Sequence, residues 1–278
     1  DSREYSIAGC FIRTIPGRSF DPGADFLNLP FMLELALNNG VSRMEGDQIG
    51  PQTGDPATFE TFDDLWAAYS KQVEALVRNA VIQLNPLRQI FAESAPTPFQ
   101  SALFPSCIEK GVDITAGGTN PYSTMGFWVC GIPNVGDSLA VIKRLVFDDK
   151  RVSMARLCEA LDRDFEGEEE LLHLIKQVPK YGNDDDYPDM MVNQALLHLD
   201  EVVSKYTVWG GSRLTIAAGA IVSNIPFGKA VGALPDGRKA GMPLSEGGIS
   251  PYQGRNVSGS TSTMRSVAKL DLARASGG

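Results

Sequence analysis

Several patterns that would identify a simple site are missing from this sequence. Its 278 residues include four cysteines, and no two of them form a CxxC pair. This spacing argues against a zinc site and against a dense disulfide framework, and free thiols suit a reducing cytoplasm. We therefore expect a cytoplasmic protein with no bound metal. The cysteines are Cys10, Cys107, Cys130 and Cys158.

Clustered positive charge and long apolar runs are also scarce. The sequence has 25 Lys and Arg against 34 Asp and Glu, a net charge of -9. Binding nucleic acid requires clustered cations, so we expect a small-molecule partner and no nucleic acid. No apolar stretch is long enough to span a bilayer, and the first residues lack the order of a secretion signal, so no membrane association is expected.

What is present is a pattern of interleaved helices and strands. Hydrophobic residues make up 43% of the chain, enough for a large core. Residues 1–30 are predicted to be loop around a short buried segment, and 213–226 a largely buried strand that ends at Pro226. Apolar residues recur at helical spacing in five segments, 30–39, 61–77, 135–146, 153–161 and 192–203.

Taken one by one, the residues that could carry chemistry have simpler explanations. A cysteine such as Cys10 is more often a small core residue than a nucleophile, and His173 and His198 show no Cys-His signature. The acidic run 184–186 is better explained by a helix start than by a metal site. The segments PDGR and SEGG lack the glycine spacing of a phosphate loop and are expected to be turns.

The order of longer motifs carries more information. The segments SIAGCF, CIEKGVDITAGGTN, PKYGNDDDYPD and GALPDGRKAGMPLSEGGISPYQGRN follow one another along nearly the whole chain. In this order and wording the chain resembles the pyruvate formate-lyase-like domain of glycyl radical enzymes. The nearest branches are the arylacetate decarboxylase and dehydratase-like lyases and the benzylsuccinate and alkylsuccinate synthases.

The resemblance implies an α/β fold, part of a ten-stranded barrel built from two half-barrels and surrounded by helices. On this basis residues 1–278 form an incomplete domain that includes the cysteine loop. No RVxGY-like run is present, so the C-terminal glycine-radical domain is expected to be absent, and the isolated fragment to be inactive and poorly soluble.

The resemblance also implies a chemistry centred on Cys10. A glycyl radical located outside this fragment, installed by a radical SAM activating enzyme, takes hydrogen from Cys10, and the thiyl radical then takes hydrogen from a small organic substrate. No other cofactor is expected. The implied partners are the substrate and the activase, and a homodimer is left open.

Two departures from the family pattern affect the expected reaction. Many eliminases and decarboxylases of the family have Glu two residues after the catalytic Cys, where this chain has Ile12, and pyruvate formate-lyase itself has two adjacent cysteines. Addition of a substrate radical to fumarate needs no base there, and Phe11 and Ile12 suit an apolar substrate. We therefore expect C-C bond formation with fumarate. Arg13 and Arg18 have the planar geometry to bind its carboxylates, although surface or loop-supporting arginines are the more usual explanation.

Residues further along the chain complete the expected substrate site. Tyr122 and Trp128 lie in a bulky, apolar segment typical of a pocket wall, although ordinary core packing explains it as well. Asn224 and Phe227 match a family strand that lines the active site. The alternatives are a glycyl radical lyase that decarboxylates or eliminates a group, and a non-catalytic barrel fragment.

Overall fold

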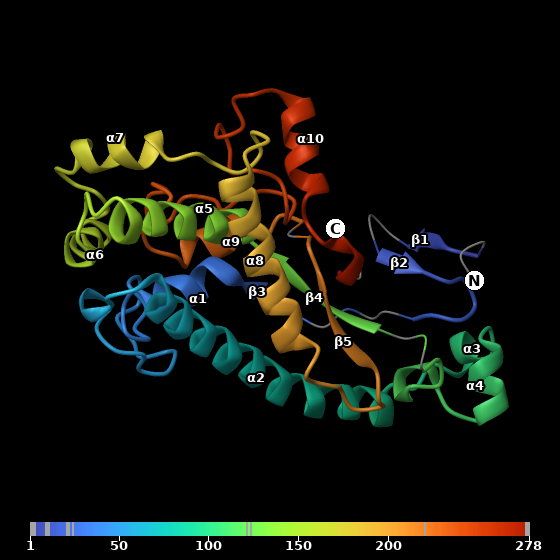
Figure 1. The fold of residues 1–278 in the computed structure, drawn as a ribbon. Helices are drawn as coiled ribbons and strands as arrows, with labels where there is room; N and C mark the ends of the chain where they lie inside the picture. Colours follow the sequence, from blue (N-terminus) through green and yellow to red (C-terminus); the bar gives the residue numbers. More distant parts are fainter. Residues whose placement is uncertain are drawn as a thin grey trace.

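The structure is a computed structural model with a small parallel sheet beside a larger set of helices (Figure 1). It describes residues 4–275 except 9–11, 21, 22, 24, 121, 123 and 220, and it leaves out the side chains of Ala8, Arg13, Thr124 and Met125. The described strands are β1 (Ser6–Ala8) and β2 (Ile12–Thr14) in an antiparallel pair, and β3 (Phe26–Asn28), β4 (Thr124–Cys130) and β5 (Arg213–Ala217) in a second sheet.

The second sheet has the order β3-β4-β5, and both of its pairings are parallel. Parallel neighbours need long crossover connections, and here helices provide them. The crossovers carry α1 to α4 between β3 and β4, and α5 to α8 between β4 and β5. The predicted interleaving of helices and strands is confirmed, as is an α/β fragment of a barrel.

Ten α-helices are described. They are α1 (Leu29–Ala36), α2 (Phe62–Ser94), α3 (Pro98–Ser101), α4 (Pro105–Lys110), α5 (Ile132–Ile142), α6 (Met154–Asp162), α7 (Glu169–Gln177), α8 (Asp186–Val203), α9 (Asn224–Lys229) and α10 (Ser260–Ala268). A π-helical turn at Lys143–Asp148 extends α5, and 3-10 turns lie at Pro56–Thr58, Ile114–Ala116 and Leu272–Arg274.

Helix α2 begins where the sequence predicts and ends much later. The Thr61 hydroxyl accepts a hydrogen bond from the Asp64 amide at 3.2 Å, and the Asp64 carboxylate accepts one from the Thr61 amide at 2.8 Å. This capping box satisfies amides that the first turn leaves unpaired. The helix continues past Pro86, whereas the apolar pattern at 61–77 predicted only its first half.

The core lies between the helices and one face of the parallel sheet. Side chains alternate along a strand, so one set faces the helices and the other set faces away. The helix-facing set is buried in the same cluster as the apolar faces of α1, α2, α5 and α8, and it consists of Leu27, Phe127, Val129, Leu214 and Ile216. The opposite face carries no comparable helical layer among the described residues.

Two sequence predictions about local structure are wrong. The strand expected over 213–226 ends at Ala217, and Pro226 lies in the first turn of α9. A turn at 221–223 with positive φ at Ile221 breaks the strand, and proline is tolerated in a first helical turn because amides there have no helical acceptor. Residues 1–30, expected to be loop around a short buried segment, instead contain the strands β1, β2 and β3, and the centre of that segment at Cys10 lies outside the described residues.

The acidic run 184–186 starts a helix, as predicted, and also forms ion pairs. Asp185 caps α8 by accepting a hydrogen bond from the Tyr187 amide at 2.9 Å. Asp184 and Asp186 contact the Lys269 ammonium at 3.0 and 2.7 Å, and the buried Asp189 contacts it at 2.9 Å. Within the described residues no group of acidic, Cys or His side chains could hold a metal, and none of the helices has the length and apolarity needed to cross a bilayer.

Candidate active-site face and the loops that support it

The face of the parallel sheet that points away from the helices is the candidate active-site face, which we call the open face. Its described residues are Phe26, Asn28, Gly126, Trp128, Cys130, Arg213, Thr215 and Ala217. The register places Phe26, Trp128 and Ala217 in one row across the three strands, and Gly126 beside Thr215 in the next. At the carboxyl ends of the strands, Cys130 is covered by Leu244 and neighbouring apolar residues.

An aromatic cluster dominates this face. The rings of Phe26 and Trp128 are 5.5 Å apart at an angle of 50°, and those of Phe26 and Phe227 are 6.2 Å apart at 76°. The Asn28 amide donates to the Phe227 carbonyl at 3.2 Å, which ties α9 to the end of β3. Phe26 nevertheless remains 37% exposed, so the cluster presents apolar surface to whatever occupies this face.

The chain that leads from the cysteine segment to β3 passes close to this cluster. A Cβ atom built on Gly23 would lie 3.6 Å from Nε1 of Trp128. The Trp128 amide also donates to the Asp25 carbonyl at 2.8 Å. Gly23 and Asp25, which follow the cysteine segment in the chain, therefore lie against Trp128 of the open face.

The structure places the predicted substrate residues in different environments. Cys10 and Phe11 lie outside the described residues, as does the side chain of Arg13. Ile12 is half-buried on β2, where its backbone pairs with Ala8. The structure therefore leaves the assignments to Cys10, Phe11 and Arg13 as predictions.

The later candidates divide into two groups. Trp128 and Phe227 come together through Phe26, as a pocket wall requires. Tyr122 is 45% exposed in the turn before β4, and it takes no part in the ring contacts described for Phe26, Trp128 and Phe227. Asn224 is buried in α9 rather than on a strand, and its carbonyl accepts a hydrogen bond from the Leu244 amide at 2.9 Å.

Thr215 is a polar residue of the open face that the sequence patterns did not single out. Its hydroxyl oxygen is buried and has no hydrogen-bond partner in the described part of the chain. It lies beside Gly126, which has no side chain to fill the space next to it. The alternation of side chains along β5 places Arg213, Thr215 and Ala217 on one face, and this pattern could have pointed to Thr215. Alternation alone does not say which face of the sheet is open.

A buried polar network supports the loops at the ends of these strands. Arg238 of the PDGR segment is 1% exposed, and its guanidinium donates to the carbonyl oxygens of Gly228, Gly232 and Met242. The buried Glu34 of α1 accepts from the Gly232 amide at 2.6 Å, and burial raises the pKa of this carboxyl. The turn prediction for PDGR is confirmed, but it missed this role.

A second part of the network joins α5 to the same segment. The Asn134 amide donates to Asp236 at 2.8 Å, and the Asp137 carboxylate accepts from the Tyr181 amide at 2.8 Å. Both carboxyls are fully buried, and burial raises the pKa of each, to about 7 for Asp137. Lys180 lies nearby, and burial lowers its pKa to about 8.

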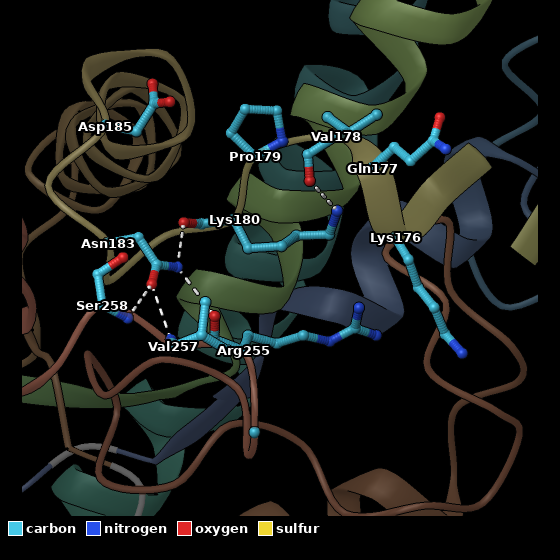
Figure 2. Close-up of a pocket in the computed structure, with 11 residues that line it drawn as sticks. Lys176, Gln177, Val178, Pro179, Lys180, Asn183, Asp185, Arg255, Val257 and Ser258 are labelled. Carbon is cyan, nitrogen blue, oxygen red and sulfur yellow. Dashed lines mark hydrogen bonds between the residues drawn. The ribbon is translucent and has the colours of Figure 1, made fainter. Parts of the chain in front are cut away.

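A cleft of about 620 Å³ lies against this network, between residues 176–185 and 254–258 (Figure 2). Asn183 joins its two walls: its amide nitrogen donates to the carbonyls of Lys180 and Arg255, and its oxygen accepts from the amides of Val257 and Ser258, all at 2.8 to 3.0 Å. The Asn183 side chain thus uses its full hydrogen-bonding capacity to hold the two walls of the cleft together.

Comparison with known proteins gives this arrangement a family. A family model described as pyruvate formate lyase-like matches residues 1–228. The chain belongs to this family. It is 37% identical to trans-4-hydroxy-L-proline dehydratase of Clostridioides difficile, over all of this chain and 35% of the relative. It is 34% identical to isethionate sulfite-lyase of Oleidesulfovibrio alaskensis, over 96% of this chain and 32% of the relative.

Solved structures of glycyl radical enzymes share the fold. The glycerol-bound B12-independent glycerol dehydratase of Clostridium butyricum has a TM-score of 0.94 at 37% identity. The matched region covers 99% of this chain and 35% of the dehydratase chain. Hydroxyproline dehydratase of Clostridioides difficile, with trans-4-hydroxy-L-proline bound, has a TM-score of 0.95 at 35% identity. The expected glycyl radical enzyme family and its barrel fold are confirmed.

The pyruvate formate lyase-like relatives also bear on the reaction. The chain spans about a third of the length of these relatives. Their names describe dehydratases and a sulfite-lyase, which supports the lyase alternative better than the expected addition to fumarate. The extent of the domain and the missing glycine loop stay predictions.

Proposed function

We propose that the full-length protein is a glycyl radical lyase that eliminates a group from a small polar substrate. The observation that carries the proposal is the agreement, over 99% of the chain at a TM-score of 0.94, with a glycerol dehydratase. The relatives named above act by elimination according to their names. The glycyl radical, supplied by a radical SAM activase, would generate the radical on the Cys10 sulfur.

The roles of this chain's own residues follow from that chemistry. The Cys10 thiyl radical removes a hydrogen atom from a substrate carbon, the neighbouring leaving group departs, and the product radical takes the hydrogen back from the thiol. Atoms and charge balance, because the thiol is regenerated and the substrate loses the leaving group with its bonding electron pair together with one proton. Phe26, Trp128 and Phe227 would hold the substrate and exclude water from the radical.

Ile12 restricts which groups leave easily. A hydroxyl leaves as water and needs a proton, whereas sulfite leaves as an anion and needs none. The described residues of the open face include no carboxylate, and Arg213 is their only cation. We therefore expect substrates with an anionic leaving group to react faster than simple diols.

The test uses the full-length protein activated anaerobically by its activase. Isethionate, glycerol, 1,2-propanediol and trans-4-hydroxy-L-proline are supplied in turn, and products are identified by NMR. Cys10→Ser should keep the glycyl radical signal in electron paramagnetic resonance and lose turnover, whereas Cys158→Ser should keep both. Cys158 is a suitable control because burial raises its pKa to about 11 and it lies on α6.

The outcomes separate the proposal from its competitors. Incorporation of labelled fumarate, without release of a leaving group, would support the C-C bond-forming alternative and reject the lyase. Ile12→Glu should increase turnover of glycerol more than that of isethionate, since positioned acid-base groups contribute about 10²-fold or more. An equal effect on both substrates would reject the argument about the leaving group.

A further inference from the structure

The cleft between residues 176–185 and 254–258 carries an unusual charge for this protein. Its lining includes Lys176, Lys180 and Arg255 with a single carboxylate, Asp185, although the whole chain has a net charge of -9. In Figure 2 the three cationic side chains extend on the same side of the cleft, and Asp185 lies on the other. The Asp185 carboxylate is already used to cap α8 through the Tyr187 amide.

Lys180 and Arg255 have N-H donors that are not used in hydrogen bonds within the described part of the chain. Lys180 is 6% exposed, and its ammonium donates to the carbonyls of Ile175 and Val178 at 2.6 and 2.7 Å, which leaves its third N-H without an acceptor among the described residues. Arg255 donates through Nη2 to the Asp236 carbonyl at 2.9 Å, and this is one of its five N-H groups. Lys176 is exposed at the rim.

The buried carboxylates behind the cleft do not cancel this charge. Asp236 accepts from the Asn134 side chain and the Arg238 amide, and Asp137 accepts from the Tyr181 amide. Burial raises the pKa of both carboxyls, which lowers their negative charge near neutral pH, and burial lowers the pKa of Lys180 only to about 8, so its ammonium stays largely charged at pH 7. Positive charge therefore remains on the cleft side of the network.

The cleft is also the right size for a small molecule. A volume of about 620 Å³ is within the usual range for ligand sites and is larger than a phosphate ion needs. Val178 and Pro179 line it beside the cations and offer apolar surface to the rest of a ligand. An arginine fork with two ammonium groups matches the oxygens and double charge of a phosphate better than those of a carboxylate.

We propose that this cleft binds the phosphate group of a small phosphate ester, with Arg255 and Lys180 donating hydrogen bonds from its walls and Lys176 adding charge at its rim. The site shares no residue with the open face, so this proposal does not rest on the proposed lyase activity. A ligand here would contact the loop that positions Tyr181 and, through it, the network on α5.

Calorimetric titration of the full-length protein tests the proposal without activation, because binding needs no radical. The probes are inorganic phosphate and glycerol 3-phosphate, with acetate at equal ionic strength as the control anion. We expect saturable binding of one phosphate compound per chain and a weaker or absent response to acetate. The affinity should fall as ionic strength rises.

Variants assign the binding to this cleft. Lys176→Met should weaken phosphate binding by about 3-fold to 10-fold, and Arg255→Gln by more than 10-fold, because a bidentate group is lost. Lys71→Met, an exposed lysine on α2, should bind as the wild type does. Circular dichroism is measured for Arg255→Gln to check that this variant folds. If its spectrum differs from that of the wild type, the result for the exposed Lys176→Met decides instead.

Three results would overturn the inference. The first is no saturable heat with either phosphate probe, and the second is equal binding of acetate. The third is an unchanged affinity in Lys176→Met when the wild type binds. A titration with poly-glutamate that saturates while phosphate does not would instead indicate a surface for an acidic protein.

Discussion

Replacing Asp137 with asparagine should make the stability of the protein less sensitive to rising pH. Asp137 is fully buried on α5, and one of its carboxylate oxygens has no hydrogen-bond partner in the described part of the chain. Burial raises the pKa of Asp137 to about 7, and the negative charge of Asp236 adds to this, although the Tyr181 amide acts in the other direction. Asparagine keeps the acceptor for Tyr181 and removes the ionisation.

The sign and size follow from proton linkage. An aspartate in the unfolded chain has a pKa of about 3.9, so between that value and 7 the folded protein holds a proton that the unfolded chain has lost. Stability therefore falls as pH rises through this window and levels off above pH 7. Integrating between pH 5 and 8 gives a loss of about 3 kcal/mol from this one group. Lys180, with a pKa lowered to about 8, changes stability only at higher pH and in the opposite direction.

Equilibrium urea unfolding of the full-length protein at pH 5, 6, 7 and 8 measures this effect. The free energy of unfolding of the wild type should fall over the series by about 3 kcal/mol more than that of Asp137→Asn. Asp47→Asn, which changes an exposed aspartate, should follow the wild type. Parallel curves for the wild type and Asp137→Asn would refute the argument that Asp137 is protonated in the folded state near neutral pH.

Three further substitutions test other parts of the structure. Arg238→Met should lower the free energy of unfolding by about 3–5 kcal/mol, because several buried carbonyl oxygens lose their donor, and Arg238→Lys should lower it by less; urea unfolding measures both. Lys269→Met should cost about 2–3 kcal/mol at pH 7 by leaving Asp189 buried without its cation; urea unfolding measures the loss. Trp128→Leu should raise KM of the activated enzyme about 10-fold with little loss of stability, whereas Trp209→Leu, which changes a more exposed indole before β5, should leave KM unchanged.

The helices were predictable because their signals are local. The capping box at Thr61 and Asp64 fixed the start of α2, and Ser153 caps α6 where the apolar pattern begins. Ends were harder to place. Pro86 does not stop α2, and α1 ends at Ala36, before the positive-φ residues Asn39 and Gly40 that were expected to stop it.

The supporting network was not predictable for a different physical reason. Its contacts join residues that are far apart in the chain, since the bond from Gly232 to Glu34 spans 198 positions and that from Asn134 to Asp236 spans 102. No periodicity reports such distances, and an aspartate and an arginine flanking a glycine look like an ordinary turn. Burial changes their meaning, because a guanidinium that is 1% exposed persists only where carbonyl oxygens surround it. The PDGR segment therefore supports the loops at the ends of the strands. The geometry of the open face depends on these buried residues, although none of them lies on that face.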